Sequence, residues 1–564
     1  MSEQTQLIDA LYGVLNEHLT KAEIADKLET PKSADLGDAA FPVFTLAKVL
    51  RQAPQQIAAN LVEQIDQTGF EKVVATGPYI NFFFDKNATT NAVLADILAQ
   101  GADYGQNNDG AGANVTIDMS SPNIAKPMSF GHLRSTVIGN AFANVLKKNG
   151  YNPVKINHLG DWGTQFGLMI AAYKKWGDKP IEDYSVSELV QLYVRINAAA
   201  KEDDAVANEG RAWFKKLEDG DAEAQSMWQT IRAESLGEFQ EVYDRLHITF
   251  DSMNGEAFFN DKMDPIVAEL TDKNLLVESQ GAQIVDLPAL LPDANLPIAM
   301  IKRTDGATLY MTRDLAAAEF RQENYDFAKS LYVVGAEQTE HFRQLKAILK
   351  LADHAWADDI EHISYGLITI NGEKMSTRKG NVVTLVEVLN MAYDAALAQI
   401  SEKNPDLPNK EIVAEQVGAG AVVFNDLMND RKNFIDFTPE NAVKFEGDTG
   451  PYVQYTIARA NSILRKAGAV DFTDLQLADD ATWDTTTLLK NFPEVVRSAW
   501  DKRDTSLIAK YALRLARAFN KYYANSKILT DDDQRNSRLA LVKAVTIVLA
   551  ESLALLGVQA PEEM

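Results

Sequence analysis

The segment VTIDMSSPNIAKPMSFGHLRST, residues 115–136, decides how the fold is assigned. Its first six residues predict a buried strand, and a helical pattern then runs from about His132 to Asn149-Gly150, a pair that suits a left-handed C-cap. Another predicted strand, PVKIN, follows at residues 153–157. This strand–helix–strand order predicts the parallel sheet of an α/β domain, in which ligands bind at the carboxyl ends of the strands.

The loop between the first strand and its helix favours an anion-binding site. Gly131 permits close approach of the backbone, and His132 falls near the helix N-terminus, where a histidine can donate to a nucleotide phosphate. No G-x-x-x-x-G-K-[ST] motif occurs anywhere, and no G-x-G-x-x-G motif opens this helix. These absences exclude a P-loop and argue against dinucleotide binding. A lone histidine near a helix start is more often a cap or a surface residue, so this motif alone is not decisive.

A second motif, NGEKMSTRKGN at residues 371–381, follows the predicted strand ISYGLITI. It places Lys374, Arg378 and Lys379 between two glycines, which suits a mobile clamp on a triphosphate. A solvated basic hairpin is the alternative, because such runs are common on surfaces.

Composition limits the other possibilities. At 564 residues the chain exceeds one core, so three or four domains are expected. The absence of cysteine excludes disulfides and Cys-ligated zinc, and seven scattered histidines without H-E-x-x-H spacing leave little case for a catalytic metal. The N-terminus has no basic or apolar segment typical of export, and no apolar run is long enough for a membrane span. A cytoplasmic protein is therefore expected.

The net charge of −25 is unusual for a protein that binds nucleic acid, but residues 451–527 hold twelve basic and eight acidic residues. Within this stretch, residues 506–523 show an apolar helical stripe: Ile508, Ala512, Leu515, Phe519 and Tyr522. A basic stripe lies about half a turn away: Lys510, Arg514, Arg517 and Lys521. Such a stripe suits RNA phosphates, and Asn520 or Tyr523 could contact an unstacked base. A solvated helix face is the alternative, although such faces usually mix charges.

Taken together, the first two motifs resemble the H-x-G-H and K-M-S-K-S sequences of class I aminoacyl-tRNA synthetases, here SFGH at residues 129–132 and KMSTR at residues 374–378. Two positions differ, because Ser129 replaces the first histidine and Arg378 replaces the last lysine. The resemblance implies that ATP is bound by Ser129, Gly131, His132, Lys374, Ser376 and Arg378. It also implies catalytic roles for His132, Lys374 and Arg378.

Longer segments resemble the arginyl-tRNA synthetase family over nearly the whole chain: NHLGDWGTQFG (157–167), TLYMTRDLAAA (308–318), VVGAEQTEHF (333–342) and FEGDTGPYVQYTIAR (445–459). This resemblance implies that Asp118 and Asp314 face the substrate guanidinium, with Tyr310 and Gln338 alongside and Asn123 at the polar end of the amino acid. Paired carboxylates fit that substrate, because a guanidinium is selected by planar, charge-assisted acceptors. The basic stripe then belongs to an anticodon-binding domain.

The family implies an α/β fold with a Rossmann-like parallel-sheet catalytic core, a helical insertion, an α+β N-terminal domain and an all-α C-terminal domain. We expect an N-terminal tRNA-contacting domain at 1–108, a catalytic domain at 109–383 with its insertion at about 180–250, a helical connector at 384–445 and an anticodon-binding domain at 446–564. The expected partners are arginine, ATP with Mg²⁺ as a substrate complex, and tRNA(Arg). We expect a monomer without a tightly bound cofactor, a protein-bound metal or a membrane contact. The family also implies activation only with bound tRNA, and no editing domain.

Three alternatives are weaker. A small-molecule nucleotidyltransferase with an H-x-G-H core lacks a long helical C-terminal domain with a basic stripe. A non-catalytic tRNA-binding paralogue is expected to lose Lys374, His132 or the paired acids, and all are present. A synthetase for cysteine would use cysteine ligands for a substrate-reading zinc, and the chain has none.

Overall fold

The structure is a computed structural model that describes residues 3–31, 33, 36–304, 310–370, 372, 383–477 and 479–564. The chain divides into two compact units. The first holds residues 1–101, 464–490 and 518–544, and the second holds residues 102–463, 491–517 and 545–564.

In the first unit, an antiparallel three-stranded sheet in the order β1-β3-β2 packs with helices. The apolar run YINFFF forms β3, and its inward residues Ile80, Phe82 and Phe84 join one apolar core. The elements are α1 (Glu3–Leu15), α2 (Lys21–Lys27), β1 (Ala39–Pro42), α3 (Ala47–Leu50), α4 (Pro54–Val62), β2 (Phe70–Thr76), β3 (Tyr79–Phe84) and α5 (Lys86–Gln100).

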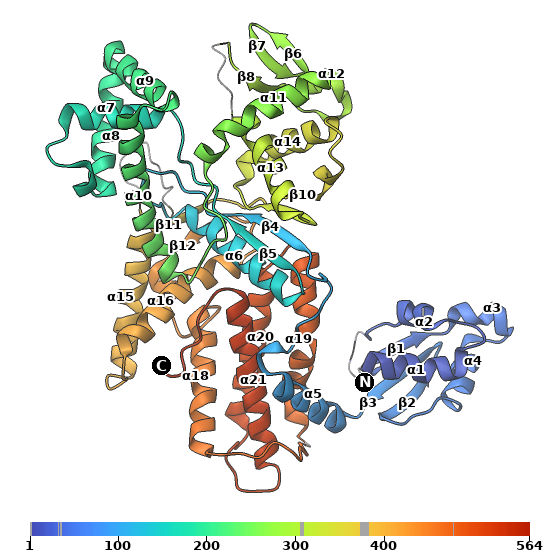
Figure 1. Cartoon of the computed structure of the whole chain (residues 1–564). Coiled ribbons are helices and arrows are strands. Elements are labelled where there is room, and N and C mark those ends of the chain that lie inside the picture. The colour runs from blue at the N-terminus through green and yellow to red at the C-terminus, as the bar shows by residue number, and fades with distance from the viewer. Residues whose placement is uncertain are drawn as a thin grey trace. The chain divides into compact units, whose positions relative to one another are not determined.

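The second unit contains the predicted parallel sheet, with four strands in the order β10-β9-β4-β5 (Figure 1). Helix α6 connects the neighbouring strands β4 and β5, and its end is capped as predicted, because Gly150 follows Asn149 with φ at +78°. Asp118 ends β4 and is paired in register with Tyr332 of β9. The elements are β4 (Asn114–Asp118), α6 (His132–Lys148), β5 (Asn152–Ile156), β9 (Lys329–Tyr332), α14 (Thr339–Leu351) and β10 (Ile360–His362).

The segment between β5 and β9 is an insertion that begins with helices, as predicted. These are α7 (Thr164–Trp176), α8 (Val186–Glu202), α9 (Asp204–Glu218) and α10 (Ala222–Arg245). A second part follows, with α11 (Met263–Asp272), β6 (Leu276–Ser279), β7 (Ala282–Val285), α12 (Leu287–Leu290), β8 (Ala299–Lys302) and α13 (Tyr310–Tyr325).

The apolar runs AQIVDL and PIAMIKR form β7 and β8 of a separate antiparallel sheet, in the order β6-β7-β8. The sequence pattern did not separate this sheet from the parallel one. The local cause is the two-residue turn Gln280-Gly281, whose φ angles of +51° and +81° suit the tight hairpin that joins antiparallel strands.

The run HISYGLITI is two strands, which corrects the prediction of one. Its first part ends β10, and its last part is β11 (Ile368–Ile370), which pairs in parallel with β12 (Ile435–Phe437) in another sheet. The chain changes sheets at Gly366, where an added Cβ would lie 2.6 Å from the carbonyl oxygen of Asn433. Only glycine fits this close approach of two backbones without movement of a neighbour.

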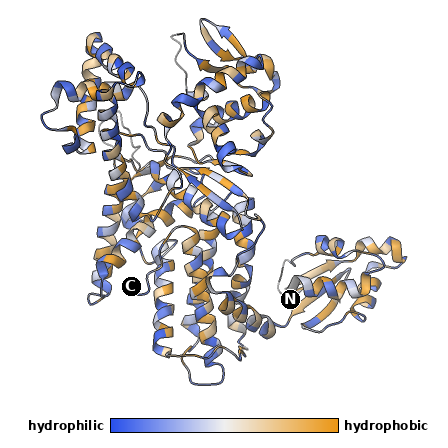
Figure 2. Ribbon diagram, viewed as in Figure 1, coloured by the Kyte–Doolittle hydropathy of each residue, from blue (hydrophilic) through white to orange (hydrophobic). Residues whose placement is uncertain are grey.

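Apart from β12, the described chain after residue 383 is helical, as predicted. The helices are α15 (Leu385–Lys403), α16 (Lys410–Leu427), α17 (Pro439–Ala442), α18 (Gly450–Ala467), α19 (Trp483–Asp501), α20 (Ser506–Asn525) and α21 (Arg535–Leu555). Hydrophilic and hydrophobic residues alternate along them (Figure 2). Among the described residues, no helix combines the length and apolar character needed to cross a membrane.

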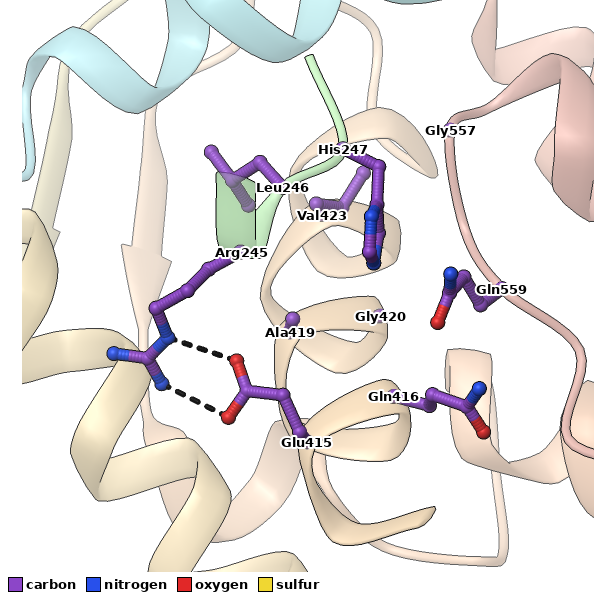
Figure 3. Close-up of a pocket in the computed structure, with 10 residues that line it drawn as sticks. All are labelled: Arg245, Leu246, His247, Glu415, Gln416, Ala419, Gly420, Val423, Gly557 and Gln559. Carbon is purple, nitrogen blue, oxygen red and sulfur yellow. Dashed lines mark hydrogen bonds and ion pairs between the residues drawn. The ribbon is translucent and has the colours of Figure 1, made fainter. Parts of the chain in front are cut away.

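Near the C-terminus, residues 557–559 pass beside α16 and the end of α10 (Figure 3). Arg245 and Glu415 join these two helices through a bidentate ion pair, with N–O distances of 2.8 and 3.1 Å. The cavity between the three segments has a volume of about 20 Å³, which is room for a single water molecule. It is therefore a gap in the packing and not a substrate pocket.

Candidate active site

The start of α6 lies where the sequence predicted a phosphate site. His132 is the first residue of the helix, and its backbone N–H donates to the carbonyl of Ser129 at 3.0 Å. The His132 Nδ1 atom lies 2.9 Å from Ser129 Oγ and 3.2 Å from the Ser129 carbonyl oxygen. Burial, with a smaller contribution from the nearby charge of Lys126, lowers the pKa of His132, so the ring is neutral near pH 7.

The segment that follows the second motif is hydrogen-bonded to the loop of the first motif. Phe130 N–H donates to the carbonyl of Val383 at 3.1 Å, and Leu385 N–H donates to that of Met128 at 2.8 Å. The second motif is also held at its start, because Gly372 N–H donates to Asp436 Oδ1 at 2.7 Å.

The predicted residues Lys374, Ser376, Arg378 and Lys379 lie outside the described residues.

The loop after β4 has a strained backbone. Ser120, Ser121 and Ala125 have φ angles of +71°, +50° and +59°, a region that costs non-glycine residues of order 1–3 kcal/mol each. Helix α10 of the insertion supports this conformation. Tyr243 lies 2.8 Å from Ser120 Oγ through its hydroxyl, and Ser235 Oγ accepts from Ala125 N–H at 3.0 Å.

Asp118 is already bound within the protein. Its Oδ2 accepts from Arg321 Nη2 at 2.7 Å, and its Oδ1 accepts from Ser121 Oγ at 2.9 Å. Arg321 is buried, and its guanidinium lies 4.9 Å from the ring centroid of Tyr332. Asp118 was predicted from the family resemblance, whereas no sequence motif marked Arg321 or Tyr332.

Asp314 lies on the same face of α13 as Tyr310 and Arg321, because these residues follow one another at helical spacing. His341 Nε2 of α14 lies 2.5 Å from Asp314 Oδ2. Burial opposes ionisation of His341, but the hydrogen bond and charge of Asp314 raise its pKa.

The structure brings Asp118 and Asp314 into one neighbourhood. Both carboxylates act electrostatically on His158 and on Tyr332, two enclosed side chains. Burial, more than any charge, lowers the pKa of His158, and its Nδ1 is a buried atom without a hydrogen-bond partner. His158 lies in the segment NHLGDWGTQFG, whose resemblance to the family was the signal that could have marked it.

Two further acids lie near Asp314. Asp161 Oδ2 pairs with Arg232 at 2.9 Å, and Glu256 Oε2 lies 3.5 Å from Arg313. Burial raises the pKa of Glu256 to about 7. The sequence analysis named neither acid, because a single carboxylate gives no signal without its partner.

The other predicted arginine-binding residues are exposed. Tyr310 begins α13 with 64% of its surface accessible, and Gln338 precedes the first turn of α14. Asn123 lies beside Gly160 in an isolated parallel bridge, with an Ile124 N–H to Gly160 carbonyl distance of 3.1 Å. All three are accessible to a ligand.

One group of described residues has the ligand types and spacing for a metal ion: Glu269, Glu319 and His354. His354 Nε2 lies 3.2 and 3.3 Å from carboxylate oxygens of Glu269 and Glu319. A hydrogen bond with Glu319 and the charges of both acids raise the pKa of His354 against the effect of burial. An imidazolium between two carboxylates satisfies these charges without an ion.

Helix α20 shows the two predicted stripes. Its apolar residues Ile508, Ala512, Leu515, Phe519 and Tyr522 are buried, and its basic residues Lys510, Arg514, Arg517 and Lys521 are exposed. Asn520 is half-buried and Tyr523 is exposed. Arg517 forms an ion pair with Asp448, and Lys521 lies 3.3 Å from Asp484. These acids come from other segments, so the sequence of the helix alone did not reveal them.

A glycine-histidine pair at a helix N-terminus, after a strand of a parallel sheet, is the arrangement expected of a class I aminoacyl-tRNA synthetase. In agreement, residues 93–438 match the family model "tRNA synthetases class I (R), catalytic domain". Residues 5–84 match "Arginyl tRNA synthetase N terminal domain", and residues 453–564 match "DALR anticodon binding domain".

Comparison with individual proteins points to one member of that class. The chain is 67% identical to the arginine–tRNA ligase of Leuconostoc citreum and 59% identical to that of Pediococcus pentosaceus, in both cases over 100% of each chain. Its structure is similar to the Thermus thermophilus arginyl-tRNA synthetase, with a TM-score of 0.81, 27% identity and coverage of 100% of both chains. The chain therefore belongs to the arginyl-tRNA synthetase family.

Proposed function

We propose that the chain activates arginine with ATP and transfers the arginyl group to tRNA(Arg). A carboxylate oxygen of arginine attacks the α-phosphorus of ATP, which forms arginyl-adenylate and releases pyrophosphate. The terminal ribose hydroxyl of the tRNA then attacks the carbonyl carbon, and AMP leaves. Both steps rely on positioning and charge stabilisation, so no covalent nucleophile is needed. The observation that carries the proposal is the pair Asp118 and Asp314, which share a neighbourhood in a chain with this family's domains.

Around the phosphates, we assign ATP to Gly131 and His132 at the start of α6, with Ser129 acting through His132, and to Lys374, Ser376 and Arg378 of the second motif. ATP enters as its Mg²⁺ complex. Gly131 has an ordinary helical backbone, and an added Cβ would lie 3.6 Å from Ser129 Oγ. The protein itself therefore leaves room for a side chain there, which supports the assignment of this space to the nucleotide.

For the guanidinium, Asp314 is the acid best suited to exchange its partner. Asp118, Asp161 and Glu256 face permanently charged arginines of the protein, but Asp314 faces a histidine that can become neutral. Asp314 also has the most exposed side chain of the four, at 28%. A substrate guanidinium can therefore replace the imidazole at Asp314, with Asp118 beside it and with Tyr310, Gln338 and Asn123 as further contacts.

Amino-acid-dependent exchange of pyrophosphate into ATP tests this function directly. We expect exchange with arginine and not with lysine, and we expect it only when tRNA(Arg) is present. Exchange driven equally well by lysine would contradict the proposed substrate. Exchange without tRNA would contradict only the order of the two binding events.

Replacement of Asp314 with asparagine is expected to weaken arginine use by at least ~2 kcal/mol, because it removes a charge-assisted acceptor. The measurement is kcat/KM for arginine, while KM for ATP stays unchanged. Asp314 is a cleaner site than Asp118, because D118N would leave Arg321 buried beside a neutral side chain.

The matched control is Asp326→Asn, an exposed acid just beyond the same helix whose left-handed backbone asparagine tolerates. If D314N keeps kcat and KM for arginine within about twofold, a difference well under 1 kcal/mol, the assignment is wrong.

For the tRNA, we propose that Lys510, Arg514, Arg517 and Lys521 contact phosphates, with Asn520 and Tyr523 at a base. The N-terminal domain at 1–108 contacts the tRNA elbow, and the anticodon-binding domain at 446–564 contacts the anticodon. The helical segment at 384–445 connects the catalytic domain to the anticodon-binding domain. We further propose a cytoplasmic monomer with its catalytic domain at 109–383. The support is the exposure of all four basic residues opposite a buried apolar stripe.

The double variant R514Q/R517Q is expected to raise KM for tRNA without loss of stability, because both side chains are exposed. Each lost phosphate contact should also flatten the log–log dependence of tRNA binding on salt by about 0.7–0.9. Binding titrations at several salt concentrations measure both effects.

The control R211Q/K215Q removes the same charge from exposed positions of α9, where Lys215 also pairs with an acid. Equal affinity and equal salt slope in R514Q/R517Q and the unmodified chain would mean that the stripe is only a solvated face.

A further inference from the structure

His132 can donate to a phosphate oxygen only when its Nε2 atom carries a proton. A neutral imidazole has one N–H group, so the partner of Nδ1 decides which nitrogen holds it. Nδ1 has two possible partners, and both are atoms of Ser129: the hydroxyl Oγ at 2.9 Å and the carbonyl oxygen at 3.2 Å.

Of these two partners, only the hydroxyl is compatible with the tautomer that carries the proton on Nε2. The carbonyl oxygen can only accept, so it requires the proton on Nδ1 and leaves Nε2 bare. The hydroxyl can donate to an unprotonated Nδ1, which leaves the proton on Nε2. The carbonyl already accepts from His132 N–H at 3.0 Å, and its distance to Nδ1 is the longer one. The geometry therefore favours the hydroxyl.

We propose that Ser129 is a positioning residue, which donates its hydroxyl proton to His132 Nδ1 and so keeps the neutral ring in the tautomer that presents Nε2–H to the α-phosphate of ATP. The inference rests on the proposed role of His132. It pairs the Ser129 hydroxyl with the His132 ring. The H-x-G-H pattern has a histidine at the position of Ser129.

The backbone holds Ser129 in place for this task. Residue 129 forms an antiparallel bridge with Thr384, and its neighbours Phe130 and Met128 are hydrogen-bonded to Val383 and Leu385. The side chain of Thr384 in turn caps α15, where Glu387 N–H donates to it at 3.2 Å. The backbone of Ser129 is therefore fixed relative to the segment that begins α15.

The tautomer would not matter if the His132 ring were an imidazolium, because that form carries a proton on both nitrogens. Burial opposes that form most strongly, and the charge of Lys126 opposes it further. The hydrogen bond with the Ser129 carbonyl favours it, but the net effect is a lowered pKa of His132. At neutral pH the working form is therefore neutral, and its tautomer matters.

Histidine-selective ¹⁵N NMR tests the tautomer without reference to activity, with the His132 signal identified by its loss in H132A. We expect the Nε2–H tautomer in the unmodified chain and in S129T, which keeps the hydroxyl. We expect the Nδ1–H tautomer in S129A, where only the carbonyl remains. An Nδ1–H tautomer in the unmodified chain, or no change in S129A, would overturn the proposal.

Kinetics test whether the tautomer serves the reaction. We expect S129A to lower kcat for pyrophosphate exchange by about 10- to 100-fold, less than loss of the whole donor. Its kcat should rise as the pH falls through the pKa of His132, because only the imidazolium of that variant has a proton on Nε2. The unmodified chain should show no such rise, and S129T should restore its pH profile.

A double-mutant cycle separates this role from direct contact with ATP. In an H132A background, S129A should change kcat by less than about twofold, because the group through which it acts is gone. An undiminished effect in that background would overturn the proposal and assign Ser129 to the substrate itself. If H132A alone has normal kcat, the proposed role of His132 fails, and the NMR result still decides the tautomer.

Discussion

Replacement of His132 with alanine is expected to lower the rate of arginine-dependent pyrophosphate exchange by ~10²–10³, the scale for loss of one preorganised donor. His132 begins α6. The acids that we assign to the guanidinium, Asp118 and Asp314, lie on other elements, at the end of β4 and in α13. The loss should therefore appear in kcat, with little change in KM for arginine.

The matched control is His18→Ala, an exposed histidine of the first unit that is expected to keep normal exchange. Thermal unfolding of both variants separates loss of chemistry from loss of fold. Near-normal exchange kinetics in H132A would remove His132 from the reaction.

The largest effect on stability is expected at Arg134, two residues further along α6. Its fully buried guanidinium lies 2.9 Å from Asp426 Oδ2 of α16 through Nε, and its Nη1 donates to the carbonyls of Gly366 and Asn433 at 2.8 Å each. R134A leaves Asp426 buried without its cation, so the free energy of unfolding should fall by about 3–5 kcal/mol. Urea unfolding measures the change.

The pH dependence of that loss has a defined sign. Burial raises the pKa of Asp426 to about 6 even though Arg134 opposes the shift, so its charged form is the costly one. A carboxyl group whose pKa is raised from 3.8 to about 6 destabilises the fold progressively as the pH rises between these two values. Without the opposing charge of Arg134 the folded-state pKa lies higher still, so this destabilisation continues to a higher pH. The loss in R134A should therefore be smallest in acid and should grow toward neutral pH.

D426N keeps the size of the side chain and leaves Arg134 its two carbonyl acceptors, so it should cost less than R134A. A change below about 1 kcal/mol in R134A at neutral pH would contradict the importance of this buried pair.

Local patterns were enough to predict the architecture of the catalytic core. The apolar strand at residues 115–120 and the glycine after Asn149 placed α6 between two parallel strands, because both signals act within a few residues. The separation of β7 and β8 into their own sheet, and of β11 from β10, depends on which distant strand each one pairs with. Sequence periodicity describes how one strand is buried and carries no information on its partner.

In the candidate site too, local sequence signals could be recognised and long-range partners could not. His132, Asp118 and Asp314 lie in recognisable segments, and they could be named from the sequence. Arg321, which pairs with Asp118, and His341, which pairs with Asp314, lie on α13 and α14 and are positioned by tertiary packing. The acids that face Arg517 and Lys521 were missed for this reason too, because a helical stripe describes only its own helix.

The strained loop at residues 120–125 also has a consequence for the order in which the enzyme is made. The hydrogen bonds that hold its left-handed backbone join Ala125 to Ser235 and Ser120 to Tyr243, across 110 and 123 positions of the chain. During synthesis the loop therefore leaves the ribosome long before α10 exists. Ser120, Ser121 and Ala125 have no reason to adopt their costly backbone until that helix has been made and has docked. The loop after β4 is thus among the early parts of the chain to be synthesised and among the late parts to reach its final conformation.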